Sequence, residues 1–344
     1  MHPGTAVSVR VGVRRSALLS SVSRAALLAL SAAVGLGVTL PSEARAGAVV
    51  VNPVQASTYT LTASNNPITF GTGTNVNTAS LTAVYGSAAA NWTITNQGSL
   101  QGGVFGLLTE SPSTVTNAGS IGGSGSPVVE MVGGGSLTNE TGGTISGLVY
   151  LNGVATNTVD NQSGATISGG VSVSQGTGSV TNAGSIGALN VNQFGVGMVL
   201  SGGGTGTVTN LSGGIIGGGI SIYGGSGSVT NAGTITGPGK YGLGVVMWKG
   251  GNVTNTGMIS GTQVGVWIFG GSGMVDNSNN ISATGTDGHG VELGAGGTVT
   301  NHAGGTISSG PGAGSGVFII GAGTVPTRPA GQSAAPAMGS PSAA

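Results

Sequence analysis

The 344-residue chain contains no cysteine, and only 5% of its residues are charged and 4% aromatic. Without cysteine the protein has no disulfide bond, thiol nucleophile or cysteine-ligated zinc site. The scarcity of Lys and Arg excludes the basic stripe that nucleic-acid-binding proteins carry. Stability must therefore come from backbone hydrogen bonds and from the burial of aliphatic side chains.

Glycine is the residue that the chain has in excess, with 73 copies. Disordered chains combine few aliphatic residues with a large net charge. Here 38% of the residues are hydrophobic, the charges sum to zero, and the glycines recur at regular intervals. Periodic glycine in an aliphatic chain indicates repeated turns in a folded protein.

The first 46 residues have the features of an export signal. An arginine-rich head precedes an apolar run from Ala25 to Leu40, and the small-x-small sequence of residues 44–46 follows. The run has the length of a signal peptide rather than of a membrane span. We interpret residues 1–46 as a signal peptide cleaved before Gly47. The Arg14-Arg15 pair leaves a twin-arginine signal open, and an uncleaved signal anchor is a second alternative.

One phrase of the Val-Thr-Asn type recurs ten times, as in "TVTNAGSIG" (114–122) and "SVTNAGSIG" (179–187). Successive copies of its Asn lie 21 to 28 residues apart. Such a period over more than half of the chain is typical of a solenoid, in which each repeat stacks on its neighbours. The ten residues are Asn96, Asn117, Asn139, Asn161, Asn182, Asn210, Asn231, Asn255, Asn277 and Asn301.

Each repeat holds three short strand-like phrases separated by glycine. The position two before the Asn is always aliphatic, the second phrase centres on Ile or Leu, and the third alternates, as in "GISIYGG" (219–225) and "GVWIFGG" (265–271). Alternation with period two predicts strands, and no helical periodicity follows residue 46. Four buried aliphatic side chains contribute about 6 to 12 kcal/mol per repeat. Ordering about 22 residues costs at least as much, so a repeat is stable only when it is stacked.

The sequence therefore predicts an all-β fold, a right-handed parallel β-helix of about ten coils with three strands and about 22 residues each. The handedness follows the preference of parallel crossover connections. The repeats occupy residues 92–324, residues 47–91 form an N-terminal cap of one or two irregular coils, and residues 325–344 form a disordered tail rich in Pro and Ala. We expect each repeated Asn to turn the chain in the left-handed conformation, with its amide bonded to the backbone or to the Asn of the next coil.

The signal, the cysteine-free mature chain and the "VTNAGSI" units resemble the passenger domains of bacterial autotransporters, the type V secreted surface proteins. The resemblance covers about two thirds of the chain. It implies passage across the inner membrane and the periplasm, transfer through an outer-membrane β-barrel translocator, and display at the cell surface or release as an adhesin, a virulence factor or, less often, an enzyme.

The sequence departs from that family because the repeats are followed by the Pro/Ala tail and not by a barrel. We expect a truncated autotransporter whose translocator is missing from this chain. A two-partner secretion substrate is the alternative, and "VVNPVQAS" (50–57) is a faint match to the N-terminal signature of that family.

The acidic residues do not predict a catalytic site. Glu130 and Glu292 share one outward position but lie seven coils, about 34 Å, apart, whereas a glycosidase pair needs about 5 to 9.5 Å. The one dense polar cluster is "TDGHGVE" (286–292), near Asp276 and His302 in the repeat, and it lacks the motifs of a hydrolase. We expect no catalysis, no metal and no cofactor.

The outward positions of the third strand predict a binding surface instead. In the last repeats they hold Tyr223, Met247, Lys249, Trp267, Phe269, Phe318 and Ile320, interrupted by Glu292. Adjoining exposed aromatic residues mark contact surfaces, although another part of the protein can also cover them. A longer loop at residues 187–197 carries Phe194, which either binds a partner or packs back onto the solenoid.

These features predict an exported or secreted cell-surface passenger that acts as an adhesin or structural protein. Its expected partners are the β-barrel translocator and a host-surface protein or glycan. Two alternatives remain: a β-helical enzyme acting on polysaccharide or peptide, and an inert spacer for a C-terminal barrel.

Overall fold

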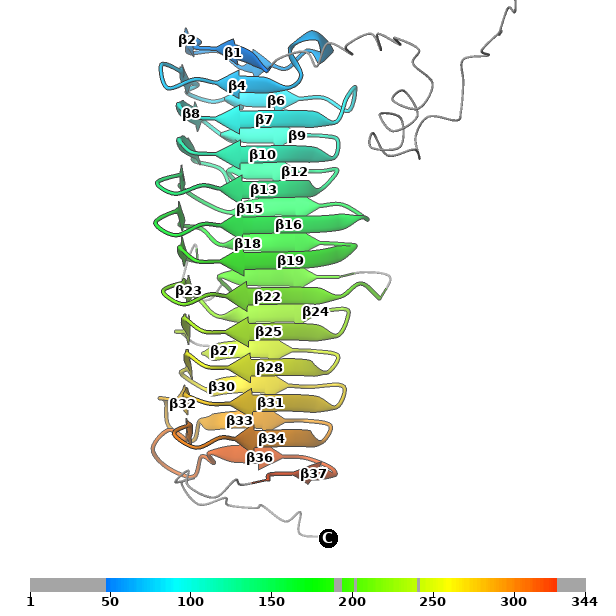
Figure 1. The fold of residues 1–344 in the computed structure, drawn as a ribbon, viewed down its shortest axis with the longest axis vertical. Coiled ribbons are helices and arrows are strands. Elements are labelled where there is room, and N and C mark those ends of the chain that lie inside the picture. Colours follow the sequence, from blue (N-terminus) through cyan, green and yellow to red (C-terminus); the bar gives the residue numbers. More distant parts are fainter. Residues whose placement is uncertain (1–47, 189–193, 201–202, 240–241, 327–344) are drawn as a thin grey trace, which may run out of the picture. The chain divides into compact units, whose positions relative to one another are not determined.

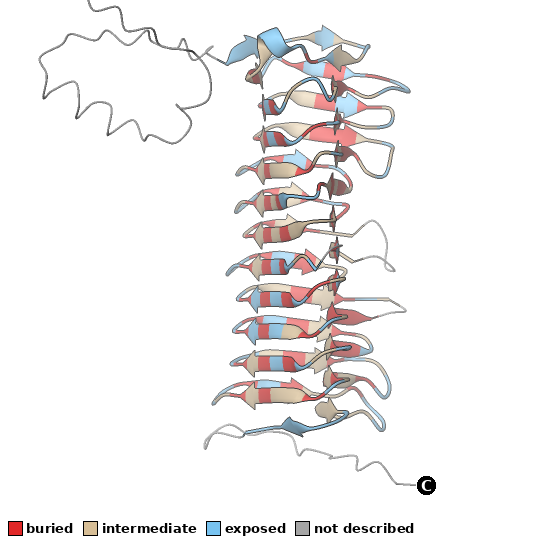
Figure 2. Ribbon diagram, turned by 90° about the vertical axis from the view of Figure 1, so that its right-hand side faces the viewer, coloured by how far each residue is buried: buried red, intermediate tan, exposed pale blue. Residues whose placement is uncertain are grey.

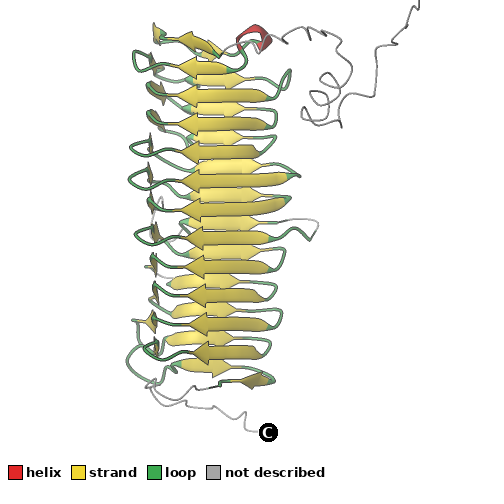
Figure 3. Ribbon diagram, viewed as in Figure 1, coloured by secondary structure: helices red, strands yellow, loops and turns green. Residues whose placement is uncertain are grey.

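The computed structural model describes residues 48–188, 194–200, 203–239 and 242–326. The predicted signal peptide (1–46) and residues 327–344 of the predicted tail lie outside this range. The described chain winds through three parallel sheets in twelve coils, in a right-handed sense (Figures 1 and 3). The prediction of a parallel β-helix is confirmed. None of the described residues forms a helix that is long and apolar enough to cross a membrane.

Sheet A, which faces the viewer in Figure 1, contains the Val-Thr-Asn phrases. Its strands pair in register, so that each repeated Asn lies beside the Asn of the next coil. They are β1 (Val49–Val51), β4 (Ile68–Phe70), β7 (Trp92–Asn96), β10 (Ser113–Asn117), β13 (Gly135–Asn139), β16 (Thr156–Asn161), β19 (Thr177–Asn182), β22 (Gly206–Asn210), β25 (Gly227–Asn231), β28 (Gly251–Asn255), β31 (Gly273–Asn277), β34 (Gly297–Asn301) and β37 (Gly323–Thr324).

Sheet B follows after each Asn corner and has the shortest strands. They are β2 (Val54–Gln55), β5 (Asn75–Asn77), β8 (Ser99–Gly102), β11 (Ser120–Gly123), β14 (Thr144–Ile145), β17 (Thr166–Ile167), β20 (Ser185–Ile186), β23 (Ile215–Gly217), β26 (Thr234–Gly237), β29 (Met258–Gly261), β32 (Asn280–Ala283) and β35 (Thr306–Ser308).

Sheet C, behind sheet A in Figure 1, contains the alternating third phrases. Its strands are β3 (Tyr59–Thr60), β6 (Val84–Gly86), β9 (Leu107–Thr109), β12 (Val129–Met131), β15 (Val149–Asn152), β18 (Val171–Ser174), β21 (Val196–Val199), β24 (Ile220–Tyr223), β27 (Leu243–Met247), β30 (Val264–Ile268), β33 (His289–Leu293) and β36 (Val317–Ile319).

Two coils precede the ten repeats and come from residues 47–91, for which the sequence predicts one or two irregular coils. Strands β1 to β3 and β4 to β6 pair in the same three sheets as the other coils, with one 3-10 turn, η1 (Ala63–Asn65), between them. Phe70 occupies the position of Asn96, and Val51 lies beside Phe70. A count based on the repeated Asn therefore misses these coils.

The core is a stack of aliphatic side chains, and buried residues alternate with outward ones along the strands (Figure 2). The residue two before each repeated Asn is at most 2% exposed in all ten copies. The single Ile or Leu predicted for the second strand is buried in every copy, from Leu100 to Ile307. Both predicted core positions are confirmed.

The ten repeated Asn residues form a buried ladder along the stack, which we call the asparagine ladder. From Asn96 to Asn277, each Nδ2 donates to the Oδ1 of the Asn in the next coil, at 2.7 to 2.9 Å. It also donates to a backbone carbonyl at its own corner, as Asn255 does to Gly257. The predicted amide bonding is confirmed. The predicted left-handed backbone is wrong, because Gln175 and Asp287 are the non-glycine residues with positive φ in the described chain.

Candidate binding surface

Four aromatic side chains gather on the outer face of sheet C at β24, β27 and β30. Tyr223, Trp248, Trp267 and Phe269 lie in contact, with neighbouring ring centroids 5.7 to 6.3 Å apart in tilted or edge-to-face arrangements. We call these four residues the aromatic patch. Parallel pairing produces the patch, since it stacks the outward position of one coil over that of the next.

Met247 does not belong to this surface, and its predicted outward orientation is wrong. It pairs with the inward Ile222 and Ile268 and is fully buried. The neighbouring Trp248 takes the outward position instead. This repeat has one extra residue, Lys249, between the strand and the Gly-Gly turn. Aligning the repeats at that turn therefore displaces the strand residues of this repeat by one position. A shift of one residue exchanges the two faces of a strand.

The edge of the patch is open to solvent. Tyr223 is 51% exposed and Phe269 is 46% exposed. Val199, paired with Tyr223, and Ile320, after β36, continue the exposed apolar row at 56% and 51%. Lys249 is exposed beside Trp248. An apolar row thus crosses six consecutive coils, from β21 to β36, with one gap at Gly294, against which Phe269 packs.

The inner side of the patch rests on a second, smaller apolar cluster. Leu243, Val246 and Val264 are at most 8% exposed, and Trp248, Trp267 and Phe194 pack against them. Phe194 therefore packs back onto the solenoid. The indole Nε1 of Trp267 is covered and has no hydrogen-bond partner, an unsatisfied donor that costs about 1 to 3 kcal/mol.

Phe318 lies next to the patch but is separated from it by Glu292. Strand pairing places Glu292 between Trp267 and Phe318. Phe318 stacks on the His289 ring, with centroids 4.9 Å apart, and His289 Nδ1 accepts a hydrogen bond from the Ser315 amide. Burial raises the pKa of Glu292, and His289 partly offsets this shift.

Replacing Glu292 by Gln is expected to raise the free energy of unfolding at pH 7, by less than about 1 kcal/mol because the side chain is partly solvated. Because the pKa of Glu292 is raised in the folded protein, the ionised carboxylate destabilises the folded state at pH values above that pKa. The gain should disappear as the pH falls through the raised pKa toward the ordinary range of Glu. Urea unfolding between pH 4 and 7 measures it. A gain that is independent of pH contradicts the explanation, and Glu140→Gln, in the turn after β13, is the control.

The polar residues noted in the sequence do not converge. Asp276 Oδ1 lies 2.6 Å from His302 Nε2 outside sheet A, whereas Glu292 belongs to sheet C. Asp287 Oδ1 accepts a hydrogen bond from the Ala313 amide. Glu130 and Glu292 occupy the same outward row seven coils apart, as predicted. Within the described ranges, no group of three His, Cys, Asp or Glu residues could hold a metal ion.

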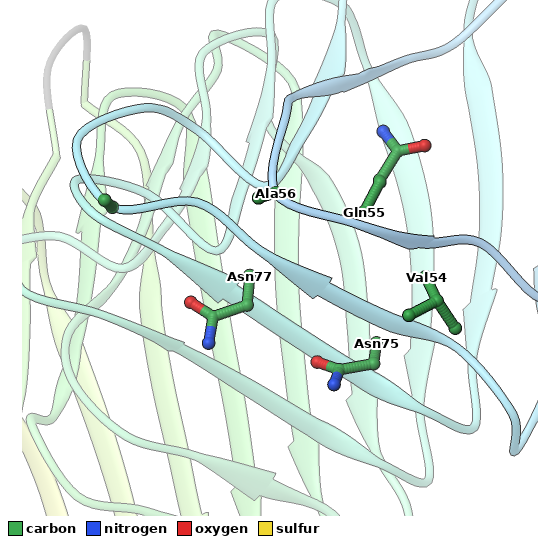
Figure 4. Close-up of a pocket in the computed structure, with 6 residues that line it drawn as sticks. Val54, Gln55, Ala56, Asn75 and Asn77 are labelled. Carbon is green, nitrogen blue, oxygen red and sulfur yellow. The ribbon is translucent and has the colours of Figure 1, made fainter.

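A shallow depression lies at the opposite end of the stack from the patch, outside sheet B (Figure 4). Val54, Gln55 and Ala56 of the first coil line it together with Asn75, Asn77 and Ala79 of the second. It has no titratable side chain and carries no chemistry beyond amide hydrogen bonding.

The chain was also compared with known proteins. No protein-family model, no curated protein and no solved structure matches it.

Proposed function

We propose that the chain is an exported β-helical passenger that adheres to a partner through the aromatic patch, without catalysis. One observation carries the proposal. Of thirteen Trp, Tyr and Phe residues in the chain, six lie on the outer face of the last coils of sheet C. They are Phe194, Tyr223, Trp248, Trp267, Phe269 and Phe318.

The environment of the patch supports a binding role. Large apolar side chains that stay half exposed in adjoining coils are typical of contact surfaces, and aromatic residues supply much of the binding energy at interfaces. The partner is a protein or glycan at a host surface. The predicted signal peptide and the resemblance to autotransporter passengers support export through the periplasm to the cell surface, by an outer-membrane β-barrel translocator.

Replacing both Tyr223 and Phe269 by Ser tests the proposal, because these side chains are exposed and their loss leaves the buried cluster beneath intact. We expect binding of the exported chain to host cells and to immobilised glycans to fall by about tenfold or more. The matched control replaces Val154 and Ile215, which are 82% and 50% exposed in other coils, by Ser. Circular dichroism checks that both variants fold. Equal binding by the two variants would refute adhesion through the patch.

A further inference from the structure

The outer face of sheet A differs in character from the patch and presents two ranks of hydroxyl groups. The ranks are the positions one and three residues before each Asn of the ladder. From β7 to β28, 14 of these 16 positions are Thr or Ser, 11 of them Thr, and the exceptions are Asp160 and Asn252. Three of these strands have Thr at both positions: Thr93-x-Thr95, Thr114-x-Thr116 and Thr207-x-Thr209.

The preference of Thr for strands does not account for these ranks. Sheet C has the same number of strands in these coils, yet its central outward row, from Leu108 to Trp267, contains two Ser and no Thr. Sheet B has one hydroxyl-rich row, and its second row is broken by glycine at Gly122 and Gly217. Only sheet A among the described sheets carries two ranks side by side.

The hydroxyl groups of these ranks are free to bond outside the protein. None of the 14 makes a side-chain hydrogen bond to another described residue. Their strands pair residue for residue without a bulge over eight coils. Ladders of identical side chains favour a flat sheet, and the asparagine ladder runs along this sheet.

The spacing of the ranks is close to that of ice. Adjacent strands lie about 4.8 Å apart, and residues i and i+2 of a strand about 6.6 Å apart. Tetrahedral water with O···O distances of about 2.75 Å has second-neighbour oxygens about 4.5 Å apart, and the geometry repeats about every 7.3 Å along the hexagonal axis. Both spacings agree to within about a tenth. Thr suits such a surface because its methyl group orders neighbouring water while its hydroxyl group bonds to it.

We propose that the outer face of sheet A between β7 and β28 binds ice. The composition of the face favours ice over a crystalline polysaccharide, because its two ranks contain no aromatic side chain on which sugar rings could stack. Asp160 is the one charged residue in these rows, so a strongly hydrated group interrupts the array once. This site is independent of the aromatic patch, which lies on another sheet.

Thermal hysteresis and inhibition of ice recrystallisation by the exported chain test the proposal. We expect both activities, and we expect Thr207→Lys with Thr209→Lys to abolish them, because two long charged side chains disrupt the array. The matched control places Lys at Ser172 and Ser221, outside sheet C, and should keep both. Circular dichroism checks folding. A chain without effect on ice, a double variant as active as the control, or retention on crystalline chitin without any effect on ice would each overturn the proposal.

Discussion

Replacing Asn255 by Asp is expected to unfold the coils around β28, at a cost of about 3 to 5 kcal/mol. The Nδ2 group of Asn255 donates to three oxygens, those of the Asn277 side chain and of the Gly257 and Asn280 carbonyls. A carboxylate at this fully buried position would face the same three oxygens without a proton to donate. Urea unfolding followed by circular dichroism measures the loss.

The matched control lies in the same strand. Asn252 is exposed, three residues before Asn255, and Asn252→Asp should change the free energy of unfolding by no more than about 0.5 kcal/mol. Burial should raise the pKa of the introduced carboxyl at position 255, so that this variant regains stability as the pH falls. If the two variants unfold alike, the ladder bonds do not stabilise the stack.

The solenoid could be predicted from the sequence because its causes are local and repeated. Every coil needs an aliphatic residue two before the Asn, and the recurrence of that pair fixes both the period and the face that is buried. The first two coils have Val51 and Phe70 in place of the repeated Asn, so the sequence predicts them only as one or two irregular coils of an N-terminal cap. Pairing with β7 still brings β4 into the same sheet, so hydrogen bonding to a neighbour is enough to form a coil without the repeated phrase.

The candidate site was predicted less well, because it depends on single residues. Because Lys249 displaces its strand in the alignment, the prediction assigned Met247 to the outer face and did not include Trp248. The alternation read from Val245 gives the correct face, since the inward positions must continue Ile220 and Ile222. The packing of Phe194 against the cluster of Leu243, Val246 and Val264 is one of two outcomes that the sequence left open, because a repeat pattern does not specify the path of an insertion.

The three faces of one repeat can therefore evolve separately. The inward residues and the Asn corner fix the coil, whereas each outward residue contacts solvent and its neighbours in the same row. Sheet A keeps Thr in its rows, whereas one outward row of sheet C changes from Ser174 to Val199 and then to Tyr223. A change on one face leaves the others intact, which is why substitutions on sheet C are valid controls for sheet A.

Replacing Gly251 by Ala is expected to cost about 3 kcal/mol or more, the second largest effect that the structure predicts. Gly251 begins β28 at φ 143°, a region that L-residues rarely adopt. An added Cβ would collide with the carbonyl oxygen of Gly227 in the preceding coil and lie 2.6 Å from Met247 Sδ. The backbone of the preceding coil and one of its core side chains both prevent the added Cβ from moving away.

Gly142→Ala separates the two causes of that cost. Gly142 also has a positive φ, 83°, but an added Cβ would have no atom within 4 Å. Conformational strain alone should then cost about 1 to 2 kcal/mol. The difference between the two urea midpoints reports the collision between coils at Gly251 together with the greater strain of its backbone angle. If the variants are equally stable, the glycine at position 251 is required for its backbone angle alone, and a larger side chain could fill the space between coils.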